Sequence, residues 1–93
     1  MTFSYDLSDR LKESLPKLAK RNKELAEQVN QKIKEIISCD ENTLEHYKNL
    51  RYGFSEFKRV HVGKSFVLLF KVYKKEKFIL FQRMEHHDSV YER

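Results

Sequence analysis

The fold is decided by residues 56–84, which read EFKRVHVGKSFVLLFKVYKKEKFILFQRM. Three runs in this stretch alternate between two faces or are mostly apolar and aromatic, as strands are. They are residues 56–62, 65–73 and 78–84. Gly63-Lys64-Ser65 and Lys74-Lys75-Glu76-Lys77 separate them and are typical of turns. The stretch therefore predicts three strands joined as an antiparallel meander.

The length of the first turn decides which side chains share a face of this sheet. With a three-residue loop, Val62 pairs with Phe66. The face covered by helices then holds Val60, Val62, Phe66, Leu68 and Phe70. Arg59 and His61 emerge on the opposite face. A two-residue loop would reverse this assignment, and the sequence leaves both open.

The residues before the meander predict a pair of helices. Leucines at helical spacing favour a helix over residues 7–20, which Asp6 or Ser8 can cap. Pro16 lies inside that pattern, so we expect a kink or a late start of the helix. Asn22 interrupts, and a second apolar stripe follows over residues 25–38. The short break predicts that the helices return antiparallel as a hairpin.

Residues 2–5 are aromatic enough to add an edge strand before the helices, and residues 39–54 are the one long candidate loop. The order is then β-α-α-β-β-β. We predict an α+β fold in which an antiparallel sheet carries an N-terminal helical hairpin on one face. A chain of 93 residues is short, so residues 1–93 are expected to form a single domain.

Basic and aromatic residues gather in the second half of the chain. Residues 1–45 hold 8 Lys/Arg against 9 Asp/Glu, whereas residues 46–93 hold 11 against 5 and ten of the twelve aromatics. This combination is typical of a surface that binds phosphate or single-stranded nucleic acid, although a similar excess often only solvates a small domain. No apolar run is long enough for a membrane span. Cys39 is the only cysteine, which favours a reducing, cytoplasmic location.

Standard catalytic signatures are missing from the sequence. It contains no Gly-rich phosphate loop and no histidine pair spaced for zinc on a helix. Adjacent His86 and His87 point to different sides of an extended chain, so we expect no metal site and no cofactor.

Three segments give the sequence a family resemblance. They are Glu45-His46-Tyr47-Lys48-Asn49-Leu50, Arg59-Val60-His61-Val62-Gly63-Lys64 and His86-His87-Asp88-Ser89-Val90-Tyr91. Together with the β-α-α-β-β-β order, they resemble the RelE family of archaeal and bacterial toxins from toxin–antitoxin pairs. The resemblance implies a small basic protein that enters the ribosomal decoding site and cuts messenger RNA as an endoribonuclease.

Cutting RNA without a metal requires a base for the ribose 2′-hydroxyl, an acid for the leaving 5′-oxygen, and cations for the phosphate. The catalytic residues that the resemblance implies are Arg59, His61, Arg83, His87 and Tyr91. Arg59 and Arg83 are suited to holding the phosphate, and His61 and His87 are suited to transferring protons. Tyr91 is suited to stacking on a base or donating a proton. Candidate RNA-binding residues are Lys58, Lys64, Lys71 and His86.

One position departs from the family pattern. Many members carry an arginine after the hairpin aromatic, where this chain has Val67, so Lys64 or Arg83 would have to replace that phosphate ligand. Two alternatives remain: a ParE-like toxin that binds DNA gyrase without catalysis, and a generic RNA-binding module. The expected partners are the ribosome, messenger RNA and a RelB-like antitoxin that wraps the toxin.

Overall fold

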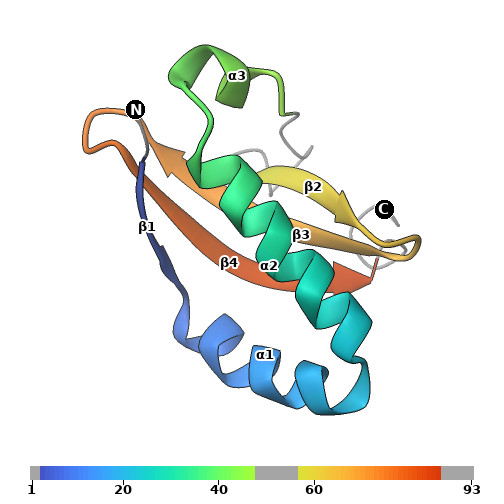
Figure 1. Cartoon of the computed structure of the whole chain (residues 1–93). Helices are drawn as coiled ribbons and strands as arrows, with labels where there is room; N and C mark the ends of the chain where they lie inside the picture. Colours follow the sequence, from blue (N-terminus) through green and yellow to red (C-terminus); the bar gives the residue numbers. More distant parts are fainter. Residues whose placement is uncertain (1–2, 48–56, 87–93) are drawn as a thin grey trace.

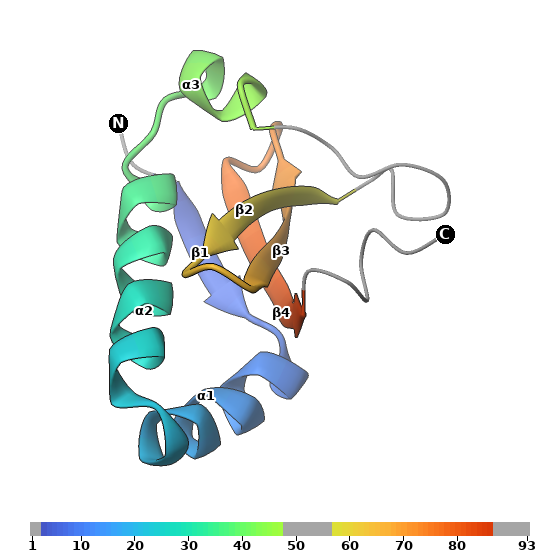
Figure 2. The same cartoon turned by 90° about the vertical axis from the view of Figure 1, so that its right-hand side faces the viewer.

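The computed structural model describes residues 3–47 and 57–86, which form a four-stranded sheet with a long helix along one face and shorter helices toward its ends (Figures 1 and 2). The strands are β1 (Ser4–Leu7), β2 (Lys58–Val62), β3 (Phe66–Tyr73) and β4 (Phe78–His86). The helices are α1 (Asp9–Arg21), α2 (Lys23–Ile37) and α3 (Glu41–Glu45). The α+β class, the N-terminal helical hairpin and the order of the predicted elements are confirmed.

The sheet is mixed, because its strand order is β1-β4-β3-β2 and β1 runs parallel to β4. The prediction of an antiparallel sheet is therefore right for β2, β3 and β4 but wrong for β1. A tight hairpin forces neighbouring strands to be antiparallel, and β1 has no hairpin to β4. Between these two strands the chain passes through the helices and two other strands, so either direction was open to it.

The loop between β2 and β3 has three residues, since Val62 pairs with Phe66. Val62, Leu68 and Phe70 consequently belong to the main core beneath the helices. Val67 and Leu69 lie on the other face, where they form a small cluster with Phe57. The register predicted for a three-residue loop is confirmed.

Helix α1 begins at Asp9, directly after its N-cap Ser8, whose hydroxyl accepts a hydrogen bond from the Leu11 amide at 3.1 Å. Pro16 lies within this helix, so the expectation of a late start is wrong. Asn22 ends α1 and caps α2 by accepting a hydrogen bond from the Leu25 amide at 3.1 Å. The same residue therefore both separates the helices and starts the second one.

Helix α2 lies along the sheet, and α1 crosses the end of the sheet (Figure 1). The apolar stripe of α2 is buried against the strands. Its buried members are Leu25, Ala26, Val29, Ile33 and Ile36.

Part of the expected long loop is helical. Asp40 caps α3 by accepting a hydrogen bond from the Thr43 amide at 2.8 Å, and Leu44 anchors this short helix in the core. The remainder of that loop, residues 48–56, lies outside the described part of the chain. None of the helices in residues 3–47 and 57–86 is long and apolar enough to cross a bilayer.

Candidate nucleic-acid interface

A β-bulge in strand β4 controls which side chains reach the sheet face that points away from α1 and α2. Leu69 of β3 pairs with Arg83, but the next residue, Phe70, pairs with Phe81. Gln82 is therefore an extra residue without a partner on β3. In a regular strand Phe81 and Arg83 would share a face. The bulge leaves Phe81 in the core and turns Arg83 to the opposite face.

Ser8 connects this bulge to the start of helix α1. Its hydroxyl donates a hydrogen bond to the carbonyl of Gln82 and accepts one from the Leu11 amide. The Ser8 amide donates to the Phe81 carbonyl at 2.9 Å. One serine thus caps the helix and holds the irregular part of the strand.

Two rows of paired residues cross the sheet on this face. Arg59, Leu69 and Arg83 form one row, and His61, Val67 and Glu85 form the next. Strands lie about 4.8 Å apart, so the outer residues of each row have Cα atoms about 10 Å apart. We call the four outer residues, Arg59, His61, Arg83 and Glu85, the polar rim.

The two central residues form the floor inside the polar rim. Val67 is 0% exposed and Leu69 is 1% exposed. The position where many family members carry an arginine is therefore a buried apolar position in this chain. Among the described residues, the charged groups beside Val67 and Leu69 in the two rows come from the neighbouring strands β2 and β4.

Glu85 is a member of the polar rim that the sequence interpretation did not include. Its Oε1 atom lies 3.4 Å from Arg10 Nη2 of α1 and 3.5 Å from Arg83 Nε. The side chain is 21% exposed, so the carboxylate is held between two guanidinium groups at the edge of the solvent. The signal was present in the sequence, because Arg83 and Glu85 are two residues apart in a strand and share a face.

Lys71 extends the basic character of this face along β3. Its Nζ atom lies 5.9 Å from the ring centroid of Phe57 and 5.4 Å from that of Tyr73. Both distances permit cation–π attraction. Arg59, His61, Lys71 and Arg83 are therefore the predicted site residues that the fold brings to one face.

Three other predicted RNA-binding residues are placed elsewhere. Lys58 pairs with Phe70 on the core side, where its ammonium donates a hydrogen bond to the Tyr47 carbonyl at 3.0 Å. Burial lowers the pKa of Lys58 below its usual value. Lys64 is exposed in the turn after Gly63.

His86 is the third predicted RNA-binding residue that lies away from the floor. Its ring contacts the ring of Phe66 edge-to-face, with 5.5 Å between the centroids. It pairs with Phe66, whose side chain packs on the main core, and not with the floor residues. The predicted catalytic residues His87 and Tyr91 lie outside the described residues.

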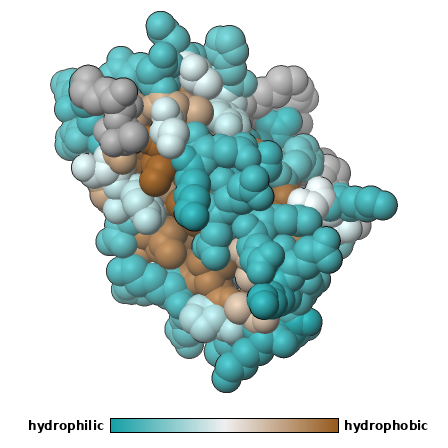
Figure 3. All heavy atoms as spheres, viewed as in Figure 1, coloured by the Kyte–Doolittle hydropathy of each residue, from teal (hydrophilic) through white to brown (hydrophobic). Residues whose placement is uncertain are grey.

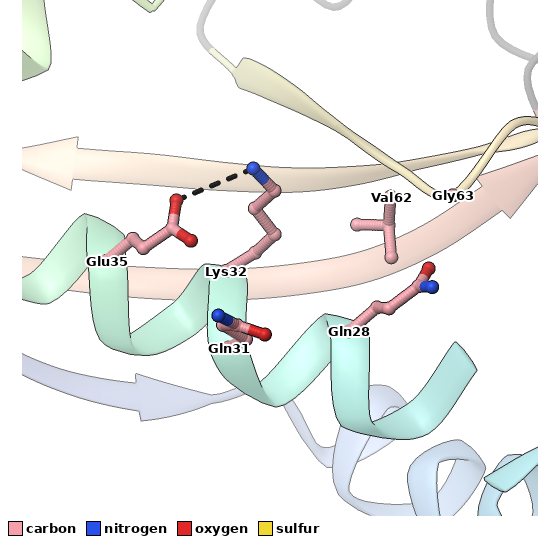
Figure 4. Close-up of a pocket in the computed structure, with 6 residues that line it drawn as sticks. All are labelled: Gln28, Gln31, Lys32, Glu35, Val62 and Gly63. Atoms are coloured by element: carbon pink, nitrogen blue, oxygen red, sulfur yellow. Dashed lines mark hydrogen bonds and ion pairs between the residues drawn. The ribbon is translucent and has the colours of Figure 1, made fainter. Parts of the chain in front are cut away.

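A groove between α2 and the end of β2, about 350 Å³ in volume, lies on the other side of the sheet (Figure 4). Its lining is Gln28, Gln31, Lys32, Glu35, Val62 and Gly63. Lys32 and Glu35 form an ion pair at 3.4 Å, as Figure 4 shows. The groove offers amides and a neutralised pair of charges, so it does not suit an RNA phosphate as the polar rim does.

The helical side of the molecule also exposes apolar surface between β1 and the helices (Figure 3). Half-buried hydrophobic residues of these elements include Leu7, Leu15 and Leu18, which pack on the main core. Within residues 3–47 and 57–86, no three His, Cys, Asp or Glu side chains are grouped so that they could hold a metal ion.

Comparison with known proteins identifies a relative that covers nearly the whole chain, although no family model matches it. A protein of Methanocaldococcus jannaschii that is named as toxin RelE4 is 37% identical over 91 residues, which cover 98% of this chain and 93% of that protein.

Solved structures of toxins share the fold. Escherichia coli YafQ matches with a TM-score of 0.73 at 15% identity, covering 96% of this chain and 98% of its own. A chain of the RelBE2 toxin–antitoxin complex of Mycobacterium tuberculosis matches with a TM-score of 0.63 at 17% identity, covering 92% of this chain and 99% of its own. A metal-bound toxin of Helicobacter pylori matches with a TM-score of 0.64 at 18% identity, covering 96% of this chain and 99% of its own. Because the chain is 37% identical to RelE4 over nearly the whole length of both and has the same fold as the solved toxins, it belongs to the RelE family of toxins from toxin–antitoxin systems.

Proposed function

We propose that this toxin is an endoribonuclease that cuts messenger RNA on the ribosome and so arrests translation. The observation that carries the proposal is the polar rim, in which Arg59 and Arg83 lie in one row of the sheet with His61 in the next. Two guanidinium groups about 10 Å apart at the Cα atoms can approach one phosphate from two sides. The bulge at Gln82 supports the assignment, because a regular strand would turn Arg83 into the core.

The reaction proposed is attack of a ribose 2′-hydroxyl on the adjacent phosphate. Arg59 and Arg83 would neutralise the charge that develops on the phosphate oxygens, and an imidazole such as His61 would transfer a proton. Lys71 lies on the same face and would bind a neighbouring phosphate as a point charge. The chemistry needs no metal, because guanidinium and imidazole groups supply both the charge and the proton transfer.

We also propose that an antitoxin encoded with this chain binds it. The RelBE2 chain with the same fold was solved in complex with its antitoxin. A net charge of +5 favours a partner with an acidic surface. Gel filtration of the chain co-expressed with the adjacent gene tests this, and separate elution of the two proteins would contradict it.

Single-turnover cleavage of ribosome-bound message tests the enzymatic proposal. Replacing Arg59 and Arg83 together by Ala should slow cleavage by about 100-fold or more, since removal of one charge-stabilising donor already costs about that much. Arg21→Ala with Lys34→Ala is the control, because it removes two positive charges from exposed helix positions. Equal rates for the two double variants would refute the phosphate clamp.

Two further readouts separate the alternatives. Cleavage that stops with a chelator, while the ribosome stays intact, would contradict a metal-independent reaction. Intact message together with damaged DNA would instead indicate a toxin that acts on DNA gyrase.

A further inference from the structure

Glu85 lies on the face of the polar rim, beside Arg83 and opposite Val67. Within β2, β3 and β4 it is the only carboxylate that the described strands turn toward the face of the polar rim. The sequence interpretation supplied cations and imidazoles for cleavage but no carboxylate base. The bulge at Gln82 sets the position of Glu85 as well as that of Arg83.

His61 is the partner of Glu85 in the same row, on the far side of the buried Val67. The 2′-oxygen and the leaving 5′-oxygen lie on opposite sides of phosphorus during in-line attack. A base and an acid must therefore approach from opposite sides. Glu85 and His61 stand on opposite sides of Val67, with Cα atoms about 10 Å apart, so they are placed to approach a phosphate from two sides.

The contacts of Glu85 hold it in place without using the whole carboxylate. Arg10 and Arg83 both contact Oε1, at 3.4 and 3.5 Å. In the described structure this leaves Oε2 to receive a proton. Arg10 comes from α1, whose first turn is fixed to β4 by Ser8, so the carboxylate is positioned by two elements.

From this geometry, and resting on the proposed function, we infer that Glu85 is the general base of RNA cleavage. The 2′-hydroxyl gives its proton to Glu85 as the 2′-oxygen forms a bond to phosphorus. The bond from phosphorus to the 5′-oxygen breaks, and His61 in its protonated form gives that oxygen a proton. The products are a 2′,3′-cyclic phosphate and a 5′-hydroxyl end. Arg83 contacts the phosphate and Arg10 is a positioning residue.

The first test is single-turnover cleavage of ribosome-bound message by wild type and Glu85→Gln. The amide keeps the size and hydrogen-bonding atoms of the side chain but does not accept the proton, so the rate should fall by about 100- to 10,000-fold. Glu35→Gln is the matched control, since Glu35 forms a surface ion pair with Lys32 at 3.4 Å outside the polar rim. It should cleave within a few-fold of wild type.

The second test identifies the direction of proton transfer. A message with sulfur in place of the bridging 5′-oxygen at the cleavage site has a leaving group that departs without being protonated. The defect of Glu85→Gln should persist on this message, because its 2′-hydroxyl still needs a base. Loss of the defect would show that Glu85 acts as an acid and would overturn the inference.

The outcomes distinguish the two proposals. A wild-type protein that leaves the message intact refutes the proposed function, and the inference falls with it. Wild-type cleavage with a Glu85→Gln rate within a few-fold of it refutes only the general base. A rate that rises in Glu85→Gln would also refute it, because the carboxylate would then merely repel phosphate.

Discussion

Replacing Ser8 by Ala should destabilise the protein and disturb the bulge at the same time. The variant loses the hydrogen bond that Ser8 accepts from the Leu11 amide and the one that it donates to the Gln82 carbonyl. Loss of an N-cap costs about 1 kcal/mol. Leaving a half-buried carbonyl without its donor costs about 1 to 2 kcal/mol more. The free energy of unfolding should therefore fall by about 2 to 3 kcal/mol.

Urea denaturation followed by circular dichroism measures this change directly. In a domain of this size 1 kcal/mol corresponds to about 4 to 8 °C, so the melting temperature should fall by about 8 to 24 °C. Ser14→Ala is the matched control, because its hydroxyl makes only a 3.3 Å bond to the Leu11 carbonyl within the same helix. Its effect should stay within about 0.5 kcal/mol. Ser8→Thr, which keeps the hydroxyl, should recover most of the loss.

The same variant separates stability from function. Measured well below its melting temperature, Ser8→Ala should still cleave message more slowly than Ser14→Ala, because the carbonyl of the bulge has lost its anchor. A loss of stability no larger than that of Ser14→Ala would refute the role of Ser8 in holding helix and strand together.

Two other substitutions test the local geometry. Gly63→Ala should cost about 1 to 2 kcal/mol, because Gly63 has a φ of +64° and a Cβ there would lie 3.2 Å from Gln28 Oε1; an unchanged urea midpoint would contradict this. Pro16→Ala should raise the free energy of unfolding by about 1 to 3 kcal/mol, because it restores an amide donor inside α1. A lower melting temperature for that variant would show that Pro16 contributes to packing.

Local patterns in the sequence were sufficient for most of the fold. Hydrophobic spacing predicts both helices and the three-strand meander, whereas the length of the turn at Gly63, which sets the register, is decided by the structure. The direction of β1 was not predictable in this way, because its partner β4 is distant in the sequence and no turn joins them. Helix α3 is too short for its own periodic signal and depends on the Asp40 cap.

The candidate site was predictable only in part, because a bulge has no clear mark in a single sequence. Regular alternation through Phe81, Gln82 and Arg83 would send Arg83 toward the helices, and only the pairing with β3 shows otherwise. Lys58 could be assigned to RNA from its charge, whereas its contact with the Tyr47 carbonyl depends on tertiary structure. Glu85 was not predicted, because a carboxylate has the opposite charge to the cations expected around a phosphate.

The strand order has a consequence for how this protein is made. Strand β4 lies between β1 and β3, yet it is the last of the described strands to be synthesised. Until it emerges, β1 has no neighbour in the sheet and the core lacks Ile79 and Phe81. Long-range pairing of this kind is slow compared with the formation of local helices. A nascent or truncated chain that ends before β4 therefore has neither a closed core nor Arg83, so the proposed phosphate clamp can form only after β4 has been synthesised.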